Sequence, residues 1–312
     1  MSRYRKLLYR PIEMIPVLIG ISFISFVLLQ LTPGDPARLM LGPRASAEAI
    51  AAIHARYGLD QPIVVQYFYY LFNLVRGDLG QSLAFRAPVG AIILTKLGPT
   101  LYLLAYGLVL SVLMTLVLAI TAAKQQGRMI DQCIRLICVI GVGVPSYFIG
   151  LLLVLVFSLK LGWFPVSGYG RSFVVNLHHL FLPALTIGIA ITPILTRNLR
   201  ATLIQQMGSD FAVAGLSKGL SSATVFRTHV LWNSLLPTVS LFGVVASFLI
   251  GGTVIIENVF NIPGLGLLLV HGVLTRDYFI VQGTTLVLSL GIVLTNLLID
   301  IAIVALDPRI KM

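Results

Sequence analysis

The chain has 312 residues, of which 57% are hydrophobic and 11% are charged. Soluble domains carry about 25% charged residues, so this composition excludes an ordinary soluble domain and indicates an all-α, polytopic membrane protein. The formal net charge of +11 does not indicate a nucleic-acid partner, because the lysines and arginines are spread along the chain and form no basic stripe.

Six membrane-spanning helices are predicted, because about 20 apolar residues cross a bilayer and six charge-free stretches reach that length. They are residues 14–34, 97–123, 136–159, 172–196, 228–256 and 278–299, the last extending past Asp300 to Leu306. The basic residues 3–10 before the first stretch resemble the start of a signal peptide. However, the apolar run is too long for a signal core and no small-residue cleavage site follows it, so we expect an uncleaved first span.

The lysines and arginines also predict the orientation. With the N-terminus in the cytoplasm, the cytoplasmic segments gather most of these residues, whereas the two short external loops hold only Lys160, Arg171 and Arg276. The external loop 33–96 is also basic, but long loops count weakly in the positive-inside rule. Both termini and the segment 197–232 are therefore predicted to be cytoplasmic.

Residues 33–96 form an insertion that is too long for a simple connector. Residues 46–56 are typical of a small helix capped by Ser46. Residues 63–75 are apolar and rich in tyrosine and phenylalanine but too short to span, which favours an interfacial helix at the headgroup level. Two roles for the insertion stay open: a structural cap on the helix bundle, and a lid or docking surface at the outer mouth of a pore.

The predicted third span is weakened by Gly141, Gly143, Gly150 and Pro145. Glycine and proline within spans often mark broken or moving helices, although small residues also let helices pack closely. Pro145 and the neighbouring Ser146 are therefore candidates for a hinge that lines a pore, with close packing as the plainer role.

The polar segment 197–232 separates two long apolar runs and predicts a short helix outside the membrane. Ser209 fits an N-cap, and Asp210 in the first turn suits the positive end of the helix dipole. Gly219 fits a C-cap, and Ser221 or Ser222 then begins a second helix that runs towards 236–237.

One face of this short helix is expected to carry few side chains. Phe211, Ala214 and Gly215 share that face at i, i+3 and i+4. Apart from the phenylalanine it is nearly bare, so another protein could approach its backbone closely. We interpret the helix as a docking element, and an ordinary polar linker is the plain alternative.

Ionisable groups within the spans are few, and they form no site of their own. Glu257 ends the fifth span and Asp300 lies in the sixth; such carboxylates are functional candidates, but these two lie at opposite faces of the membrane. The central parts of the spans carry no charge, which argues against an ion-coupled secondary transporter. No histidine is placed to activate a serine, and Cys133 and Cys138 show no metal-ligand pattern. We therefore expect no catalytic site and no metal.

Eight short motifs follow one another along nearly the whole chain. They are Gly34-Asp-Pro36, Gly58-Leu-Asp-Gln-Pro62, Gly77-Asp-Leu-Gly-Gln-Ser82, the segment from Asp210 to Pro237, Glu257-Asn-Val-Phe260, Pro263-Gly-Leu-Gly266, Arg276-Asp-Tyr278 and Leu306-Asp-Pro-Arg309. In this order and on this topology, they resemble the inner-membrane permease subunits of bacterial ABC importers, in the dipeptide, oligopeptide and nickel branch.

The resemblance implies a type I importer permease fold, with both termini in the cytoplasm and a cytoplasmic coupling helix. Residues 1–96 would hold the first span and the insertion, and residues 97–312 a five-helix core whose coupling loop covers 197–237. The residues implied to dock ATPase subunits are Asp210, Phe211, Ala214, Gly215, Lys218 and Gly219.

The family pattern of this loop is Glu-Ala-Ala, three residues, Gly, and a later Leu-Pro. Ala214 and Gly215 take the alanine places, Gly219 the glycine place and residues 236–237 the Leu-Pro. Val213 stands where the family has glutamate, which puts in doubt an ion pair from that position; Asp210 or Lys218 could supply one instead.

The resemblance also implies a division of labour, with this chain as half of a channel that works by alternating access. The chain has no Gly-x4-Gly-Lys phosphate loop, so ATP and Mg would be bound by partners and not by this chain. The implied partners are a second, homologous permease subunit, two cytoplasmic ATPases, an external solute-binding protein and membrane lipid. The gate candidates are Pro145, Ser146, Glu257 and Asn258. Di- or oligopeptides are the expected cargo, with glutathione or a nickel chelate as alternatives.

Overall fold

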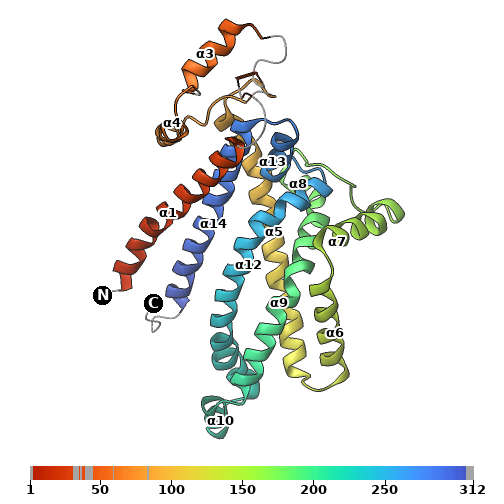
Figure 1. Cartoon of the computed structure of the whole chain (residues 1–312). Coiled ribbons are helices and arrows are strands. Elements are labelled where there is room, and N and C mark those ends of the chain that lie inside the picture. The colour runs from red at the N-terminus through yellow and green to blue at the C-terminus, as the bar shows by residue number, and fades with distance from the viewer. Residues whose placement is uncertain are drawn as a thin grey trace. The chain divides into compact units, whose positions relative to one another are not determined.

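The computed structural model describes residues 3–30, 35, 37–38, 45–58, 60–82 and 84–306. In these ranges the chain is helical, and the only β pairing is an isolated bridge between Gln81 and Pro88 (Figure 1). The motif residues at 34, 36, 59 and 307–309 lie outside the described ranges.

The helices follow one another with short connections. Their bounds are α1 Arg3–Gln30, α3 Ala47–Tyr57, α4 Ile63–Val75, α5 Val89–Lys124, α6 Met129–Gly143, α7 Ser146–Leu153, the π-helical η1 Val154–Lys160, α8 Phe173–His179, α9 Phe181–Met207, α10 Asp210–Ser217, α11 Ser222–Val225, the π-helical η2 Phe226–Leu231, α12 Trp232–Val259, α13 Leu265–Leu274 and α14 Tyr278–Leu306.

Within the described residues, four helical segments are long and apolar enough to cross a membrane: Val89–Lys124, Phe181–Met207, Ser222–Val259 and Tyr278–Ala305. A fifth candidate is the pair formed by Met129–Gly143 and Ser146–Lys160, bent by 107° at its break. The helix α1 covers the predicted first span, although its part with described side chains is shorter, Glu13–Val27. The structure thus supports four or five of the six predicted spans, and the orientation stays a prediction.

The chain divides into two compact units. The first unit comprises Met1–Leu7, Leu101–Ile262 and Ile292–Met312, and the second comprises Leu8–Thr100 and Pro263–Gly291. The second unit therefore joins the insertion 33–96 to the segment around α13.

In the first unit, α9 is the central helix, because α6, α7 and α12 all pack against it. Small residues bring the helices close. An added Cβ at Gly107 on α5 would lie 2.6 Å from Ile187, and one at Gly141 on α6 would lie 2.8 Å from Pro193. Two of the third-span glycines, Gly141 and Gly150, thus serve close packing, whereas nothing lies within 4 Å of a Cβ at Gly143.

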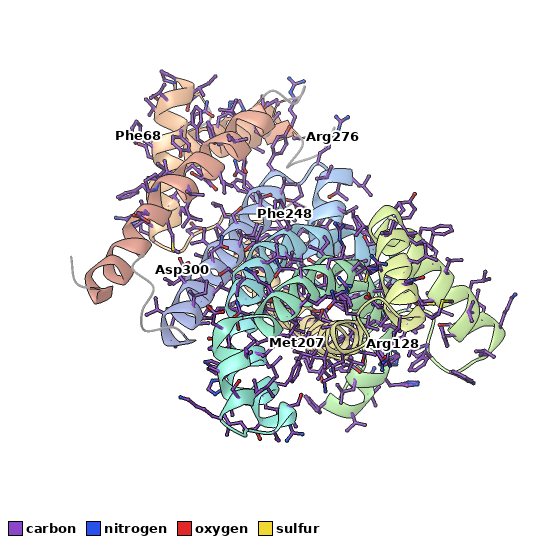
Figure 2. The ribbon with its side chains drawn as sticks, turned by 90° about the horizontal axis from the view of Figure 1, so that it is seen from below. Phe68, Arg128, Met207, Phe248, Arg276 and Asp300 are labelled. Carbon is purple, nitrogen blue, oxygen red and sulfur yellow. The ribbon has the colours of Figure 1, made fainter. Side chains whose placement is uncertain are left out.

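The outward sides of these helices keep much of their apolar surface exposed. Phe248 on α12, for example, is 78% exposed (Figure 2). Soluble monomers rarely expose so many large apolar side chains, and a membrane protein covers them with lipid or with other subunits.

In the second unit, a turn of the insertion is held against the start of α14. The Ser82 hydroxyl donates to Asp277 Oδ2 at 2.6 Å, and the Ala84 N–H donates to the same oxygen at 3.1 Å. The other carboxylate oxygen of Asp277 accepts from the Ile280 N–H at 3.2 Å and so caps α14. Two motifs that lie 195 residues apart therefore meet at one buried carboxylate.

Two further contacts of this unit each involve one motif residue. The Thr100 hydroxyl accepts from the Leu265 N–H at 2.8 Å, at the first residue of α13. Gly80 has a φ of +80°, and a Cβ there would lie 2.5 Å from the Phe279 ring, so a side chain would meet both strain and a clash. The capped helix predicted from Ser46 is confirmed as α3, because Ser46 Oγ accepts from the Ala49 N–H.

Candidate functional site

The predicted docking helix is present as α10, Asp210–Ser217, which lies beyond the ends of the long helices of the first unit (Figure 1). Ser209 occupies the N-cap position as predicted. Its side chain does not cap the helix, however; the hydroxyl donates to the Gln206 carbonyl at 2.6 Å. This hydrogen bond ties the start of α10 to the last turn of α9. Asp210 is exposed in the first turn, where its charge suits the helix dipole.

The end of α10 is fixed by backbone geometry. Gly219 has a φ of +84°, and its N–H donates to the Leu216 carbonyl at 3.0 Å while the Leu220 N–H donates to the Gly215 carbonyl at 3.2 Å. This pair of hydrogen bonds is a Schellman motif, which places a left-handed residue just after the C-cap. The C-cap itself is Lys218, so the predicted glycine stop is one residue beyond the cap.

The exposure of the residues on α10 agrees with the predicted accessible face except at Gly215. Phe211 and Ala214 are exposed, as are Lys218 and Gly219. Gly215 is buried instead, because it faces α11, where an added Cβ would lie 3.1 Å from Val225. Periodicity places Gly215 beside Phe211 and Ala214, but the second helix covers the edge of that face. Gly215 is thus an inner packing residue and not part of the accessible surface.

A compact apolar cluster anchors α10 to the ends of three long helices. Ala212 and Val225 are buried in it together with side chains of α5, α9 and η2–α12, namely Ala119, Ala123, Leu199, Leu203 and Val230. In addition, Lys124 Nζ at the end of α5 lies 4.8 Å from the Phe226 ring centroid, a cation–π distance. Force applied to α10 would therefore reach α5, α9 and α12 through packed side chains.

An ion pair near this end of the first unit was not predicted. Arg200 on α9 binds Asp131 on α6 with both ends of its guanidinium group, at 2.6 and 2.7 Å, and the Gly127 N–H donates to the same carboxylate at 3.0 Å. Asp131 is buried. From the sequence, Arg200 is only one of the basic residues of the segment 197–232 that predict the orientation. The available signal was Asp131 itself, an acidic residue among the basic residues between the second and third spans.

The gate candidates lie on two neighbouring helices. Pro145 stands at the break between α6 and α7 as the N-cap of α7, and Ser146 begins that helix. Glu257 is 0% exposed near the end of α12, and the Asn258 side-chain amide donates to the Val254 carbonyl at 2.7 Å.

These two helices pack together directly, because an added Cβ at Gly150 on α7 would lie 3.5 Å from Val259, the last residue of α12, and 3.1 Å from the ring of Phe260 just after it. The helix that follows the break therefore lies against the end of α12. A pore-lining role for the four gate candidates stays a prediction.

Two family matches cover most of the chain. The family described as "Binding-protein-dependent transport system inner membrane component" matches residues 115–312, and the family described as the N-terminal part of such membrane components matches residues 3–103.

Curated relatives match almost end to end. The "Glutathione transport system permease protein GsiC" of Escherichia coli (strain K12) is 37% identical over 302 residues, which is 97% of each chain. The protein of the same name from Salmonella typhimurium is 36% identical over 304 residues, 97% of this chain and 98% of that one.

A solved structure described as "Crystal structure of an amino acid ABC transporter with histidines" matches with a TM-score of 0.50 and 15% identity. The match covers 70% of this chain and 94% of the other. At this identity the likeness concerns the fold alone.

Proposed function

This chain belongs to the binding-protein-dependent transport system inner membrane component family, as an ABC importer permease of the inner membrane, and we propose that it is one half of a peptide-conducting channel. The observation that carries the proposal is the exposed helix α10, anchored to the ends of α5, α9 and α12. An importer subunit of this kind has to receive mechanical work from ATPases, and a rigidly anchored, accessible helix meets that need.

In the proposed mechanism, the partner ATPases bind ATP and Mg and close on α10. Their contact surface consists of the exposed Asp210, Phe211, Ala214, Lys218 and Gly219. Asp210 and Lys218 carry opposite charges at the two ends of the helix. Either residue could form the ion pair with an ATPase that Val213 cannot form. The cluster behind α10 is close-packed, and packed cores shift between discrete arrangements more readily than they deform. Movement of α10 therefore becomes movement of whole spans.

The same mechanism assigns the break between α6 and α7 to the gate. The break carries Pro145, which lacks a backbone N–H and so cannot continue the hydrogen bonding of α6. The helix α7, which follows the break, packs against the end of α12, where Glu257 and Asn258 lie. A bent, discontinuous span next to a buried carboxylate is a suitable element for opening and closing a passage.

For the cargo we propose short peptides, with glutathione, itself a tripeptide, as the first candidate to test. Two named relatives at 36–37% identity are glutathione permeases. A nickel chelate is the alternative that the branch leaves open. The remaining proposed partners are a second permease subunit, two ATPases and an extracytoplasmic solute-binding protein that selects the cargo.

Co-purification tests the proposed assembly. The tagged chain is extracted in mild detergent, and the proteins that stay bound are identified by mass spectrometry. We expect a second permease of the same family and one or two kinds of ATPase. Recovery of a homo-oligomer that transports glutathione without ATP would contradict the proposal.

The predicted orientation has its own test, in a background with Cys133→Ser and Cys138→Ser. Single cysteines are introduced as Ser46→Cys before α3 and Ser222→Cys at the start of α11, and both positions are exposed. An impermeant thiol reagent added to intact spheroplasts should label only the first variant. Labelling of the second alone would reverse the topology.

A further inference from the structure

The helix α4 packs one of its faces on α1, within the second unit. The Tyr67 hydroxyl donates to the Ile19 carbonyl at 3.0 Å and shares a 2.8 Å hydrogen bond with the Ser22 hydroxyl. The Tyr67 ring lies edge-on to Phe23 at 5.2 Å between centroids, and 5.4 Å from Phe26. This side of α4 is thus fixed to α1 by hydrogen bonds and aromatic contacts.

These contacts place α4 beside α1 at a level before the last residues of α1. Phe23 and Phe26 precede Gln30, the last residue of α1, by seven and four residues, which is about 6 to 10 Å at 1.5 Å per residue. The charge-free stretch of α1 continues to residue 34. The helix α4 therefore lies against the part of α1 that is predicted to span the membrane, which would place it deeper than the headgroup level that the sequence predicts.

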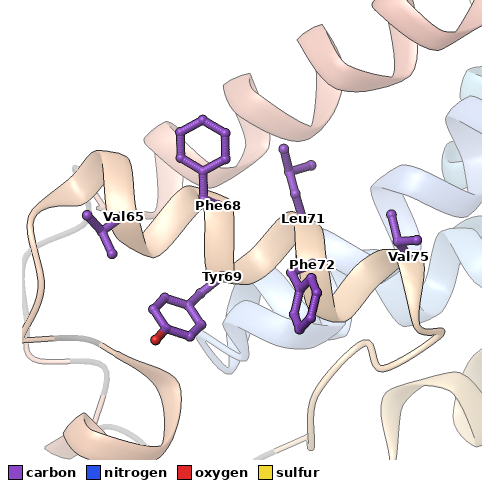
Figure 3. Close-up of a pocket in the computed structure, with 6 residues that line it drawn as sticks. All are labelled: Val65, Phe68, Tyr69, Leu71, Phe72 and Val75. Atoms are coloured by element: carbon purple, nitrogen blue, oxygen red, sulfur yellow. The ribbon is translucent and has the colours of Figure 1, made fainter.

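The opposite face of α4 is apolar and exposed. Its side chains line a hollow of about 540 Å³, formed by Val65, Phe68, Tyr69, Leu71, Phe72 and Val75 (Figure 3). Phe68 is 64% exposed. The helix carries no charged residue, and the nearest charges that follow and precede it are Arg76 and Asp60.

We propose that α4 is inserted in the leaflet where α1 ends, predicted to be the outer one, and that phospholipid acyl chains fill this hollow. Three observations identify lipid as the occupant. The depth against α1 is that of an interfacial helix whose apolar face enters the acyl region. As the second observation, α1 also exposes apolar side chains, namely Ile15, Ile19 and Phe23, so the exposed surfaces of both helices are apolar.

The third observation is the position of the charge at the end of α4. The guanidinium of Arg76 lies 3.9 Å from the centroid of the Phe72 ring, and the residue is exposed. An arginine at the end of an interfacial helix covers apolar surface with its stem and reaches the phosphate level with its head. A docked protein would instead be expected to meet charged groups at the border of the face, and the six lining residues carry no charge and one hydroxyl, that of Tyr69.

The test measures whether lipid touches the hollow. Phe68→Trp is made in the full-length chain with Trp163→Phe and Trp232→Phe, which remove the two native tryptophans. The chain is placed in bilayers whose phosphatidylcholine is brominated either near the glycerol end or near the methyl end of the acyl chain. Bromine quenches tryptophan only on contact, so the position of the bromine reports depth.

We expect at least about a twofold loss of emission with bromine near the glycerol end, and a smaller loss with bromine near the methyl end. The matched control is Ala52→Trp at an exposed position on α3, which should not be quenched. Phe72→Trp repeats the measurement one turn along α4 if the first variant is not obtained. Unquenched emission at short wavelength would show that protein covers the face, and unquenched emission at long wavelength would show water; either result overturns the proposal.

Discussion

The helices α10 and α4 are both short and both expose apolar side chains, yet they are built for different neighbours. The exposed face of α10 mixes Phe211 with Ala214 and lies between Asp210 and Lys218, so charge is available at both of its ends. The exposed face of α4 is aromatic and aliphatic throughout. Mixed, charge-flanked surfaces suit protein partners, whereas uncharged aromatic surfaces suit the membrane interface.

The anchoring of the two helices differs in the same way. A cluster of small and aliphatic side chains joins α10 to three long helices, whereas α4 is held on one helix by Tyr67 and Phe26. The comparison teaches that exposure alone does not identify a docking surface. What matters is which charges border the surface and what lies behind it.

The largest expected effect comes from breaking the ion pair between α6 and α9, the helix that precedes α10. Asp131→Ala leaves Arg200 without its carboxylate in a half-buried site, and breaking a buried ion pair by removing one partner costs about 3 kcal/mol. We expect a correspondingly lower melting temperature for the detergent-solubilised chain. Asp131→Asn is the matched control, because it keeps the acceptor for the Gly127 N–H and should cost less. An unchanged melting temperature in the alanine variant would show that the pair adds no stability.

The second prediction sets the two helices against each other with one substitution. Phe68→Glu puts a charge on the face of α4 that we assign to lipid, which should cost about 2 kcal/mol. Phe211→Glu puts the same charge on α10, at an exposed position where stability changes stay within about 0.5 kcal/mol. Thermal unfolding of both variants in nanodiscs checks the difference. Equal losses would remove the distinction between the two surfaces.

The third prediction tests whether α10 carries work. Ala214→Glu places a long charged side chain on the proposed ATPase contact, and we expect substrate-stimulated ATP hydrolysis of the reconstituted complex to fall about tenfold, equivalent to about 1.4 kcal/mol. The same substitution at the exposed Ala201 on α9 is the control and should leave the stimulated rate unchanged. Normal stimulation in the Ala214 variant would mean that the ATPases contact a different surface.

Local patterns predict the local structure well. The Ser46 cap, the limits of α10 and the left-handed turn near Gly219 all follow from residues within a few positions of one another. The apolar stretches likewise indicate the long helices, because spanning length is a property of a continuous segment.

The pairings across the fold cannot be read from such patterns. Arg200 and Asp131 are 69 residues apart in the sequence, and Ser82 and Asp277 are 195 residues apart. The sequence around each residue does not indicate which residue it contacts. Periodicity gives the relative directions of the residues on α10 but not the rotation of the helix against its neighbours. It therefore predicts an accessible position for Gly215, which is in fact buried against α11. Pro145 predicts that the helix breaks, but it does not predict the 107° bend. Proline fixes its own φ and not the direction of the helix that follows.

The smallest expected effect concerns the end of α10. Gly219 has a φ of +84° with nothing within 4 Å of an added Cβ, so Gly219→Ala tests backbone strain without a clash. A left-handed alanine costs about 1 kcal/mol, which should shorten α10 by fraying its last turn. Gly208→Ala is the matched control: its φ is −89°, which alanine adopts freely, so it should be neutral or slightly stabilising. Hydrogen exchange of the α10 amides measures both. Faster exchange in the Gly219 variant alone would show that the Schellman turn stabilises the last turn of α10, and equal exchange would mean that the cluster behind Ala212 is sufficient.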